Sequence, residues 1–233
     1  MPELFALMPA LADVSHPLLL NRRVVVVGVS AVLYDDARFV FEVAHPRHWG
    51  WSDERHIVGI GGIGGRIKPG ESALACLQRE VREEIGSDFL LEPTRRTALI
   101  HQNELAAWLD VPATSDRVAP YMLNLLPAQL ERPDKPDHLA IVSFRGILQQ
   151  EPCRKDLFGL LTIERSALEP FFERAEWPLE EALALDGLTF DLESPLPSGS
   201  VLRPTLTGRA FQALLQHTSP PAVLAEKPIR PSG

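Results

Sequence analysis

Three glutamates stand within one turn of a segment whose aliphatic residues follow a helical period. Residues 65–87 read GRIKPGESALACLQREVREEIGS, and Glu80, Glu83 and Glu84 lie near the end of this segment. Its aliphatic residues recur at three- and four-residue steps: Leu74, Leu77, Val81 and Ile85. This spacing predicts an amphipathic helix over 72–85, with the three carboxylates together on a different face from the aliphatic stripe. Such close carboxylates repel one another, and a hard divalent cation that prefers oxygen ligands is the natural candidate to hold them.

The residues before this helix predict a strand and a glycine-rich loop. Residues 56–63 have the apolar character of a buried strand, and four glycines there would let the backbone approach a ligand: Gly61, Gly62, Gly64 and Gly65. Either Glu71 or Ser72 is expected to cap the helix. No Gly-Lys-Ser/Thr follows the loop, which excludes a nucleoside-triphosphatase phosphate loop. A solvated acidic surface is the alternative explanation for a glutamate-rich helix.

The whole segment resembles the Nudix box, the signature of the Nudix hydrolase superfamily. The box positions that match at the expected spacing are Gly65, Glu71, Arg79, Glu80, Val81, Glu83, Glu84 and Gly86. The one departure is Ser87, where an aliphatic residue is usual, and it weakens the expected packing at the helix end rather than the chemistry. Outside the box the resemblance extends loosely to the strand pattern from about 22 to 165.

The resemblance implies an α+β fold: a Nudix-type α/β/α sandwich with a mixed β-sheet, the box helix after a glycine-rich loop, and extra C-terminal helices. It implies hydrolysis of a nucleoside diphosphate linked to another moiety, with Mg²⁺ or Mn²⁺ as cofactor. Metal ions would neutralise the pyrophosphate and lower the pKa of the attacking water. A Nudix-fold sensor that binds a nucleotide or nucleotide sugar without cleaving it is the alternative function.

Residue roles can be carried over from the box to the matching positions. The implied metal ligands are Glu80, Glu83, Glu84 and the carbonyl of Gly64, the residue before the box. The implied catalytic residues are Glu80, Glu83 and Arg79, because one box glutamate often activates water and the arginine orients a box glutamate by an ion pair. Glu71 is expected to support the site without touching the substrate.

Candidates for the substrate-binding and general-base roles also lie outside the metal ligands. Trp49 and Trp51 could stack on a base or could anchor their loop to the core, and Arg66 and Glu131 are further substrate-binding candidates. We also expect a carboxylate from outside the box to complete the site. The acids considered for this role are Glu131, Asp134, Asp137 and Glu104. If none of them serves as the base, Glu80 is the choice within the box.

Composition adds limits on partners and location. The chain has 233 residues, of which 45% are hydrophobic and 23% charged, with a net charge of −8. This charge argues against a stable nucleic-acid partner. We expect a small-molecule nucleoside diphosphate derivative instead, with a homodimer left open. Two cysteines give neither a disulfide framework nor a zinc pattern. No leader or membrane span is recognised, so a cytoplasmic location is expected by default.

The organisation expected along the chain is an N-terminal extension (1–21), a Nudix domain with C-terminal helices (22–217) and a flexible tail (218–233). Hydrophobic patterning predicts strands at 22–34, 38–44, 90–101, 121–126, 138–148 and 157–163. It predicts helices at 166–175, 178–185 and 205–217, and irregular connections at 45–55, 103–120 (irregular or briefly helical), 130–137 and 187–204.

Overall fold

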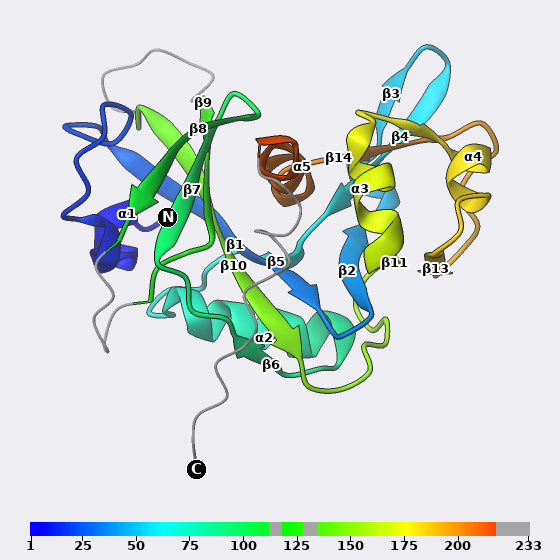
Figure 1. Cartoon of the computed structure of the whole chain (residues 1–233), viewed down its shortest axis with the longest axis horizontal. Helices are drawn as coiled ribbons and strands as arrows, with labels where there is room; N and C mark the ends of the chain where they lie inside the picture. The colour runs from blue at the N-terminus through cyan, green and yellow to red at the C-terminus, as the bar shows by residue number, and fades with distance from the viewer. Residues whose placement is uncertain (112–117, 128–134, 218–233) are drawn as a thin grey trace.

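The computed structural model describes residues 1–111, 118–127 and 135–217. Within these ranges it has an α+β fold, built on a mixed sheet of 14 strands that divides into two wings (Figure 1). The expected loop at 130–137 and the tail at 218–233 lie wholly or mostly outside the described residues. No helix in the described part of the chain is long and apolar enough to cross a bilayer.

The first wing is built around β1 (Val24–Tyr34), which pairs in parallel with β10 (His138–Leu148). Its other strands are β5 (Ile63–Gly65), β6 (Phe89–Leu91), β7 (Arg96–His101), β8 (Glu104–Asp110) and β9 (Met122–Pro127). β5 lies antiparallel to the middle of β1, and β9 lies between β10 and β7. β10 has the bounds that its apolar alternation predicts.

The second wing begins where β2 (Arg38–Val43) turns back from the end of β1. It continues through β4 (Arg55–Gly61), β3 (Gly50–Ser52), β11 (Gly159–Glu164), β12 (Trp177–Pro178), β13 (Leu188–Leu192) and β14 (Val201–Pro204). β4 belongs to this wing and the following strand, β5, to the first, so the chain crosses between the wings at Gly62.

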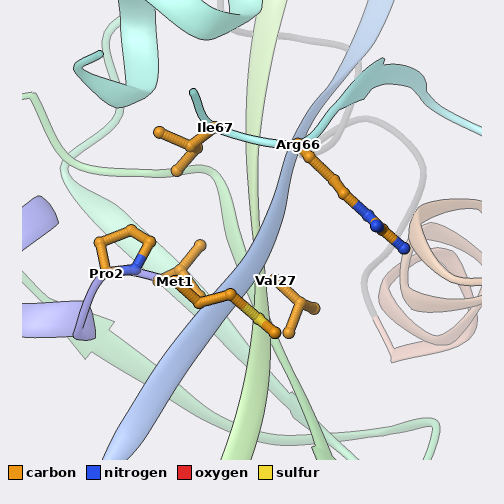
Figure 2. Close-up of a pocket in the computed structure, with 6 residues that line it drawn as sticks. Met1, Pro2, Val27, Arg66 and Ile67 are labelled. Carbon is orange, nitrogen blue, oxygen red and sulfur yellow. The ribbon is translucent and has the colours of Figure 1, made fainter. Parts of the chain in front are cut away.

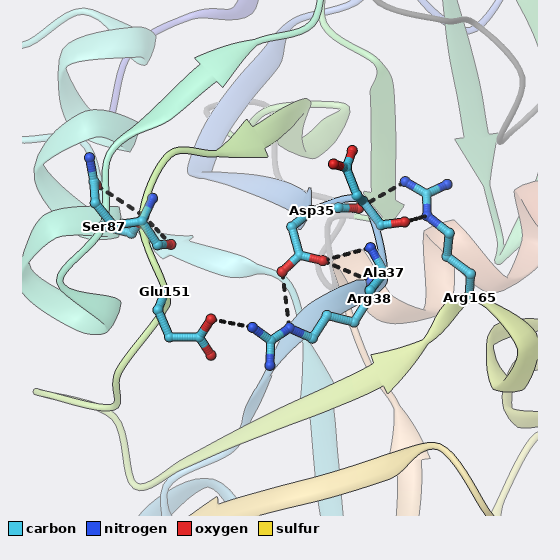
Figure 3. Close-up of polar contacts among 8 residues, drawn as sticks. Asp35, Ala37, Arg38, Ser87, Glu151 and Arg165 are labelled. Carbon is cyan, nitrogen blue, oxygen red and sulfur yellow. Dashed lines mark hydrogen bonds and ion pairs between the residues drawn. The ribbon is translucent and has the colours of Figure 1, made fainter.

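The β1–β2 turn is held by the polar contacts drawn in Figure 3. The Asp35 carboxylate accepts hydrogen bonds from the backbone N–H groups of Ala37 and Arg38, each at 2.9 Å. Arg165, at the start of α3 (Arg165–Glu173), donates to the carbonyls of Asp35 and Asp36, also at 2.9 Å. Arg38 also pairs with Glu151. These contacts join the β1–β2 turn to two later segments of the chain.

The helix α2 (Ala73–Ile85) covers one face of the first wing (Figure 1). Of the two expected caps, the structure uses Ser72, whose Oγ accepts from the N–H of Ala75 at 3.2 Å. The apolar stripe of α2 packs into a core cluster with residues of β1, β5 and β10. Ser87, the departure from the box, is 1% exposed, and its hydroxyl donates to the carbonyl of Gln150 at 3.1 Å. A polar contact therefore fixes the position where an aliphatic residue is usual.

The last described helix, α5 (Thr207–His217), lies between the two wings and fills the space that separates them (Figure 1). Its buried residues join a second core cluster with aromatic residues of β2 and α3. The start of α5 is bonded to the first wing, because Thr207 Oγ1 lies 2.6 Å from Ser30 Oγ. A short helix, α4 (Leu179–Leu183), lies in the second wing.

The N-terminal segment is packed onto the first wing. It contains α1 (Leu4–Leu7) and a 3₁₀ turn (Pro9–Leu11), and the side chains of Leu4, Leu11 and Leu19 are fully buried in the first core cluster. Residues 1–21 therefore contribute to the core of the described structure.

Three expectations about regular structure were wrong. The connection at 103–120 contains β8, which forms a hairpin with β7 through Gln102 and Asn103, both with positive φ (53° and 64°). Two successive residues of positive φ are what a two-residue hairpin turn requires, but Gln-Asn lacks the usual glycine signal. The loop at 187–204 contains β13 and β14, whose partners β11 and β4 are distant in sequence. The loop expected at 45–55 contains a 3₁₀ turn (Pro46–His48) and β3, which pairs with β4. The range 90–101 does contain a strand, β7, and a further strand, β6, overlaps its start and pairs with β10.

Candidate active site

Two glycines of β5 allow close contacts on different sides of the strand. A Cβ added at Gly64 would lie 2.2 Å from the carbonyl oxygen of Val29, so glycine there allows β5 to lie against β1. A Cβ added at Gly65 would lie 2.3 Å from Oε1 of Glu80. Glycine at position 65 therefore allows a carboxylate of α2 to lie directly against the strand.

Glu84 of α2 also contacts β5. Its Oε2 accepts a hydrogen bond from the N–H of Gly64 at 3.1 Å. Burial, together with the negative charges of Glu42 and Glu80, raises the pKa of Glu84 from 4.5 to about 8, although the Gly64 N–H opposes this change. The site therefore concentrates negative charge with too little positive charge to balance it.

Arg79 connects three glutamates on the solvent side of the same cluster. It binds Glu71 with two contacts, Nε–Oε1 at 2.8 Å and Nη2–Oε2 at 3.1 Å. Its Nη1 lies 2.7 Å from Oε1 of Glu80 and 3.0 Å from Oε2 of Glu83. Hydrogen bonds from Arg79 and from the N–H of Lys68 lower the pKa of Glu71 to about 2. Glu71 thereby ties the loop before α2 to Arg79, in the supporting position expected for it.

Glu42 is an acidic neighbour that the sequence interpretation missed. It lies on β2 opposite Gly61, and a Cβ added at Gly61 would be 3.8 Å from its Oε2. Val40, two residues earlier on the same face of β2, belongs to the core cluster that contains α2, whereas Phe41 and Val43 face the other cluster. Glu42 is therefore on the α2 side of the sheet. A signal was available, since Glu42 interrupts the apolar run FVFEV at a position that alternation assigns to a buried face.

The four acids expected from outside the box lie elsewhere or beyond the described residues. Asp137 accepts from the backbone N–H of Arg23 at 2.7 Å and pairs with Arg22, and the Arg23 bond lowers its pKa. It lies at the start of β1, about 20 Å along the strand from the residue opposite Gly64. Glu104 is exposed at the β7–β8 turn. Glu131 and Asp134 lie outside the described residues.

Neither tryptophan of the 45–55 segment reaches the box. The indole N–H of Trp49 donates to the carbonyl of Ala44 at 2.7 Å, and the ring packs edge-on against Phe158. Trp51 is 66% exposed and contacts His56 on the β3–β4 hairpin. This hairpin projects from the opposite side of the molecule to α2 in Figure 1. Trp49 thus anchors its loop to the core, and stacking of either tryptophan on a base stays a prediction.

Arg66 lies next to the box glycines. It lines a cavity of about 240 Å³ together with Met1, Pro2 and Ile67, and its side chain points away from these three residues (Figure 2). Its carbonyl accepts from Nη2 of Arg79 at 3.3 Å. The backbone of Arg66 is therefore beside the carboxylate cluster, and a role of its side chain in substrate binding stays a prediction.

The donors of this cluster suit a hard divalent cation. No group of three or more His, Cys, Asp or Glu side chains within the described ranges is arranged as a ready ligand set, and Arg79 contacts two of the implied ligands, Glu80 and Glu83. The fit rests on chemistry: carboxylate oxygens are the preferred ligands of Mg²⁺ and Mn²⁺.

We expect the stability of the metal-free protein to fall as pH rises from about 4.5 to about 8. Glu84 keeps its proton in the folded state over this window and loses it in the unfolded chain, so the folded state binds more protons and is favoured at low pH. Thermal unfolding between pH 5 and 8 measures the effect. Glu84→Gln should flatten this dependence, and Glu42→Gln should reduce it. An equal slope in Glu84→Gln and wild type would contradict the assignment.

Comparisons with known proteins agree with the geometry. The sequence profile of the NUDIX domain matches residues 24–151. This span is more than half of the 233 residues and contains the whole of α2 and β10. No curated protein sequence matches the chain.

Several solved structures are similar to the described fold. A MutT NUDIX hydrolase from Burkholderia pseudomallei is 17% identical, with 84% of this chain and 98% of that chain covered and a TM-score of 0.34. A NUDIX-family hydrolase from Clostridium perfringens is 14% identical, with coverages of 65% and 87% and a TM-score of 0.39. A NUDIX hydrolase from Nitrosomonas europaea is 21% identical, with coverages of 56% and 63% and a TM-score of 0.33.

Proposed function

The chain belongs to the Nudix family, and from this premise we propose that it hydrolyses the pyrophosphate bond of a nucleoside diphosphate linked to another moiety. The observation that carries the proposal is the intact set of box carboxylates on α2, gathered against Gly64 and Gly65. Nudix hydrolases generally use divalent metal ions and act on small nucleotide derivatives. We propose Mg²⁺ or Mn²⁺ as the cofactor here.

Glu80, Glu83, Glu84 and the carbonyl of Gly64 would hold the metal. When bound, it would neutralise the pyrophosphate and lower the pKa of the attacking water. Glu42 is the carboxylate from outside the box that we now favour as an additional ligand, because it faces the same side of the sheet and its charge acts on Glu84. This choice replaces Asp137 and Glu104.

The protein's own side chains have distinct tasks in this proposal. Arg79 fixes the positions of Glu80 and Glu83 through its Nη1, and Glu71 fixes Arg79. Arg66, adjacent to Gly65, supplies a positive charge for a phosphate group in a site that is otherwise acidic. A water molecule near the box carboxylates would lose its proton to one of them, and Glu80 is the choice among the box residues.

A panel of nucleoside diphosphate derivatives, assayed for phosphate or nucleotide release with Mg²⁺ and with Mn²⁺, tests the function. We expect release that depends on metal and stops with a chelator. Binding of a panel member without any release would favour the alternative, a Nudix-fold sensor. Release that persists in excess chelator would contradict the metal-dependent mechanism.

Arg79→Lys should weaken metal binding by about ten- to a hundredfold in an intact fold. Lysine keeps the charge but cannot make two parallel contacts to Glu71 and also hold Glu80 and Glu83. Mn²⁺ titration followed by electron paramagnetic resonance measures the affinity, and circular dichroism checks the fold. Arg96→Lys, in an exposed pair with Asp110, is the matched control and should bind as wild type does. Unchanged Mn²⁺ affinity in Arg79→Lys would show the pairing to be incidental.

A further inference from the structure

The start of α5 packs directly on the backbone that leads into the box. A Cβ added at Gly62, where the chain crosses between the wings, would lie 2.7 Å from Cγ2 of Thr207. From the other side, a Cβ added at Gly208 would lie 2.2 Å from the carbonyl oxygen of Ile60. Real Cβ atoms do not come so close to other atoms, so glycine at both positions allows the two segments to touch. This contact belongs to the placement of α5 between the wings (Figure 1).

Three buried hydroxyls join the start of α5 to β1 and β10. Thr207 Oγ1 lies 2.6 Å from Ser30 Oγ and 3.5 Å from Ser143 Oγ, and the two serine oxygens are 2.9 Å apart. All three residues are buried. A buried hydroxyl costs free energy unless it has a hydrogen-bond partner, and here the hydroxyls supply partners to one another.

The two serines stand side by side in strands that are otherwise largely apolar. Ser30 on β1 pairs with Ser143 on β10 in the strand register. The neighbours of Ser30 along β1, Val29 and Ala31, belong to the core cluster that contains α2. Alternation therefore turns the serines to the α5 side of the sheet. A buried polar cluster whose members are satisfied fixes one arrangement of the segments that it joins, here β1, β10 and α5.

Thr207 contacts the backbone before the box in two ways. Its methyl group packs on Gly62, and its hydroxyl bonds to Ser30, which is the β1 partner of Gly64. Gly64 has φ 154°, and a Cβ added there would lie 2.5 Å from Cα of Ser30. The backbone of Gly64 thus lies directly on that of Ser30. Thr207 therefore holds both ends of the Gly62–Gly64 segment from the α5 side.

The same segment contacts the box carboxylates on the α2 side. The N–H of Gly64 donates to Oε2 of Glu84 at 3.1 Å, and the carbonyl of Gly64 is one of the proposed metal ligands. A misplacement of about 1 Å at a reacting centre can cost about a hundredfold in rate. A shift of the Gly62–Gly64 backbone would therefore act on the metal site, although its cause lies on the other side of the sheet.

We propose that Thr207 is a positioning residue for Gly64: it fixes the Gly62–Gly64 backbone so that the Gly64 N–H meets Glu84 and the Gly64 carbonyl is presented to the metal. The metal part of this assignment rests on the proposed function, whereas the hold on the Gly64 backbone does not. Thr207 lies outside the span 24–151 that the family profile matches. Helix α5 thus brings to the site a residue that the box does not contain.

The test compares two buried threonines, each replaced by valine, which has nearly the same shape. Thr207→Val removes the hydroxyl and keeps the methyl group on Gly62. Thr97→Val is the matched control, because Thr97 is fully buried and its hydroxyl donates to the carbonyl of Pro120 at 2.7 Å. Thr97 is on β7, three strands away from β1 in the sheet. Both variants should lose about three- to tenfold in the folding equilibrium, the value of one neutral hydrogen bond, as measured by urea unfolding.

Two measurements on the full chain separate positioning from stability. In the metal-free protein, nuclear magnetic resonance follows hydrogen exchange of the Gly64 amide, which should be at least about fivefold faster in Thr207→Val than in Thr97→Val, since only the first change loosens this segment locally. Mn²⁺ titration followed by electron paramagnetic resonance should show about three- to tenfold weaker binding in Thr207→Val and wild-type binding in Thr97→Val. Thr207→Ser, which keeps the hydroxyl, should restore wild-type values of both quantities.

Three results would overturn the proposal: equal Gly64 exchange in the two valine variants, unchanged Mn²⁺ affinity in a folded Thr207→Val variant, or a Thr207→Ser variant as impaired as Thr207→Val. If Thr207→Val does not fold, Ser30→Ala removes the same hydrogen bond from the other side and should give the same two results. A wild-type protein that binds no Mn²⁺ would reject the proposed metal-dependent function, and the exchange of the Gly64 amide would then decide the role of Thr207 alone.

Discussion

Glu83→Gln and Glu84→Gln are each expected to lower turnover at least about a hundredfold. The amide keeps the size of the side chain but removes the charge that would hold a divalent cation, and catalytic electrostatics act on this scale. Steady-state kinetics at saturating Mn²⁺ measure the effect. Glu169→Gln, on the exposed face of α3, is the matched control and should keep the wild-type rate.

Glu42→Gln extends the same series to the residue outside the box. We expect about tenfold weaker Mn²⁺ binding, measured without substrate by electron paramagnetic resonance, because the variant removes one of the charges gathered around Glu84. The metal-free forms of all three variants should be at least as stable as wild type, since each relieves repulsion. Near wild-type rates in both box variants would sink the proposed mechanism, whatever the result at Glu42.

Arg145→Met is expected to destabilise the fold by about 3–5 kcal/mol, the cost of leaving a buried charge without its partner. Arg145 and Glu92 have side chains only 7% exposed and are joined at 2.6 Å. The Tyr34 hydroxyl donates to the same carboxylate, and Arg145 lies over the ring of Tyr121. Burial and the bond to Glu92 raise the pKa of Tyr34, so this hydroxyl remains protonated.

Urea unfolding measures this loss. The control is Arg96→Met, which breaks an exposed pair with Asp110 and should change the free energy of unfolding by less than about 1 kcal/mol. Replacing both Arg145 and Glu92 with apolar residues should recover part of the stability, because no charge is then left alone. A loss in Arg145→Met as small as that in Arg96→Met would mean that water reaches this pair.

The parts of the fold that could be predicted from the sequence carry their own local signal. α2 has a helical period and a serine cap, and β10 is a long run of mostly apolar residues. β13 and β14 were missed because their stability comes from pairing with β11 and β4, which lie far away in sequence. The hydrophobic pattern within a segment does not show which distant strand the segment will pair with.

The candidate site could likewise be predicted only where its residues follow one another along one segment of the chain. Spacing along one helix identified the box carboxylates, and Arg79 forms an ion pair with Glu80. The hydrogen bond from the N–H of Gly64 to Glu84 has no signal in that spacing. Glu42 was missed because its place beside Glu84 depends on how β2 is paired and which face it turns to α2.

The position of α5 between the two wings has a practical consequence for the limits of the protein. The family profile ends at residue 151, whereas α5 begins at Thr207. A fragment cut where the family similarity ends would keep every box residue and still expose the aromatic faces that α5 covers, including Phe39 and Phe41. Such a fragment should aggregate rather than fold. The part of the chain that the family profile matches is therefore shorter than the part that is needed to form the complete hydrophobic core.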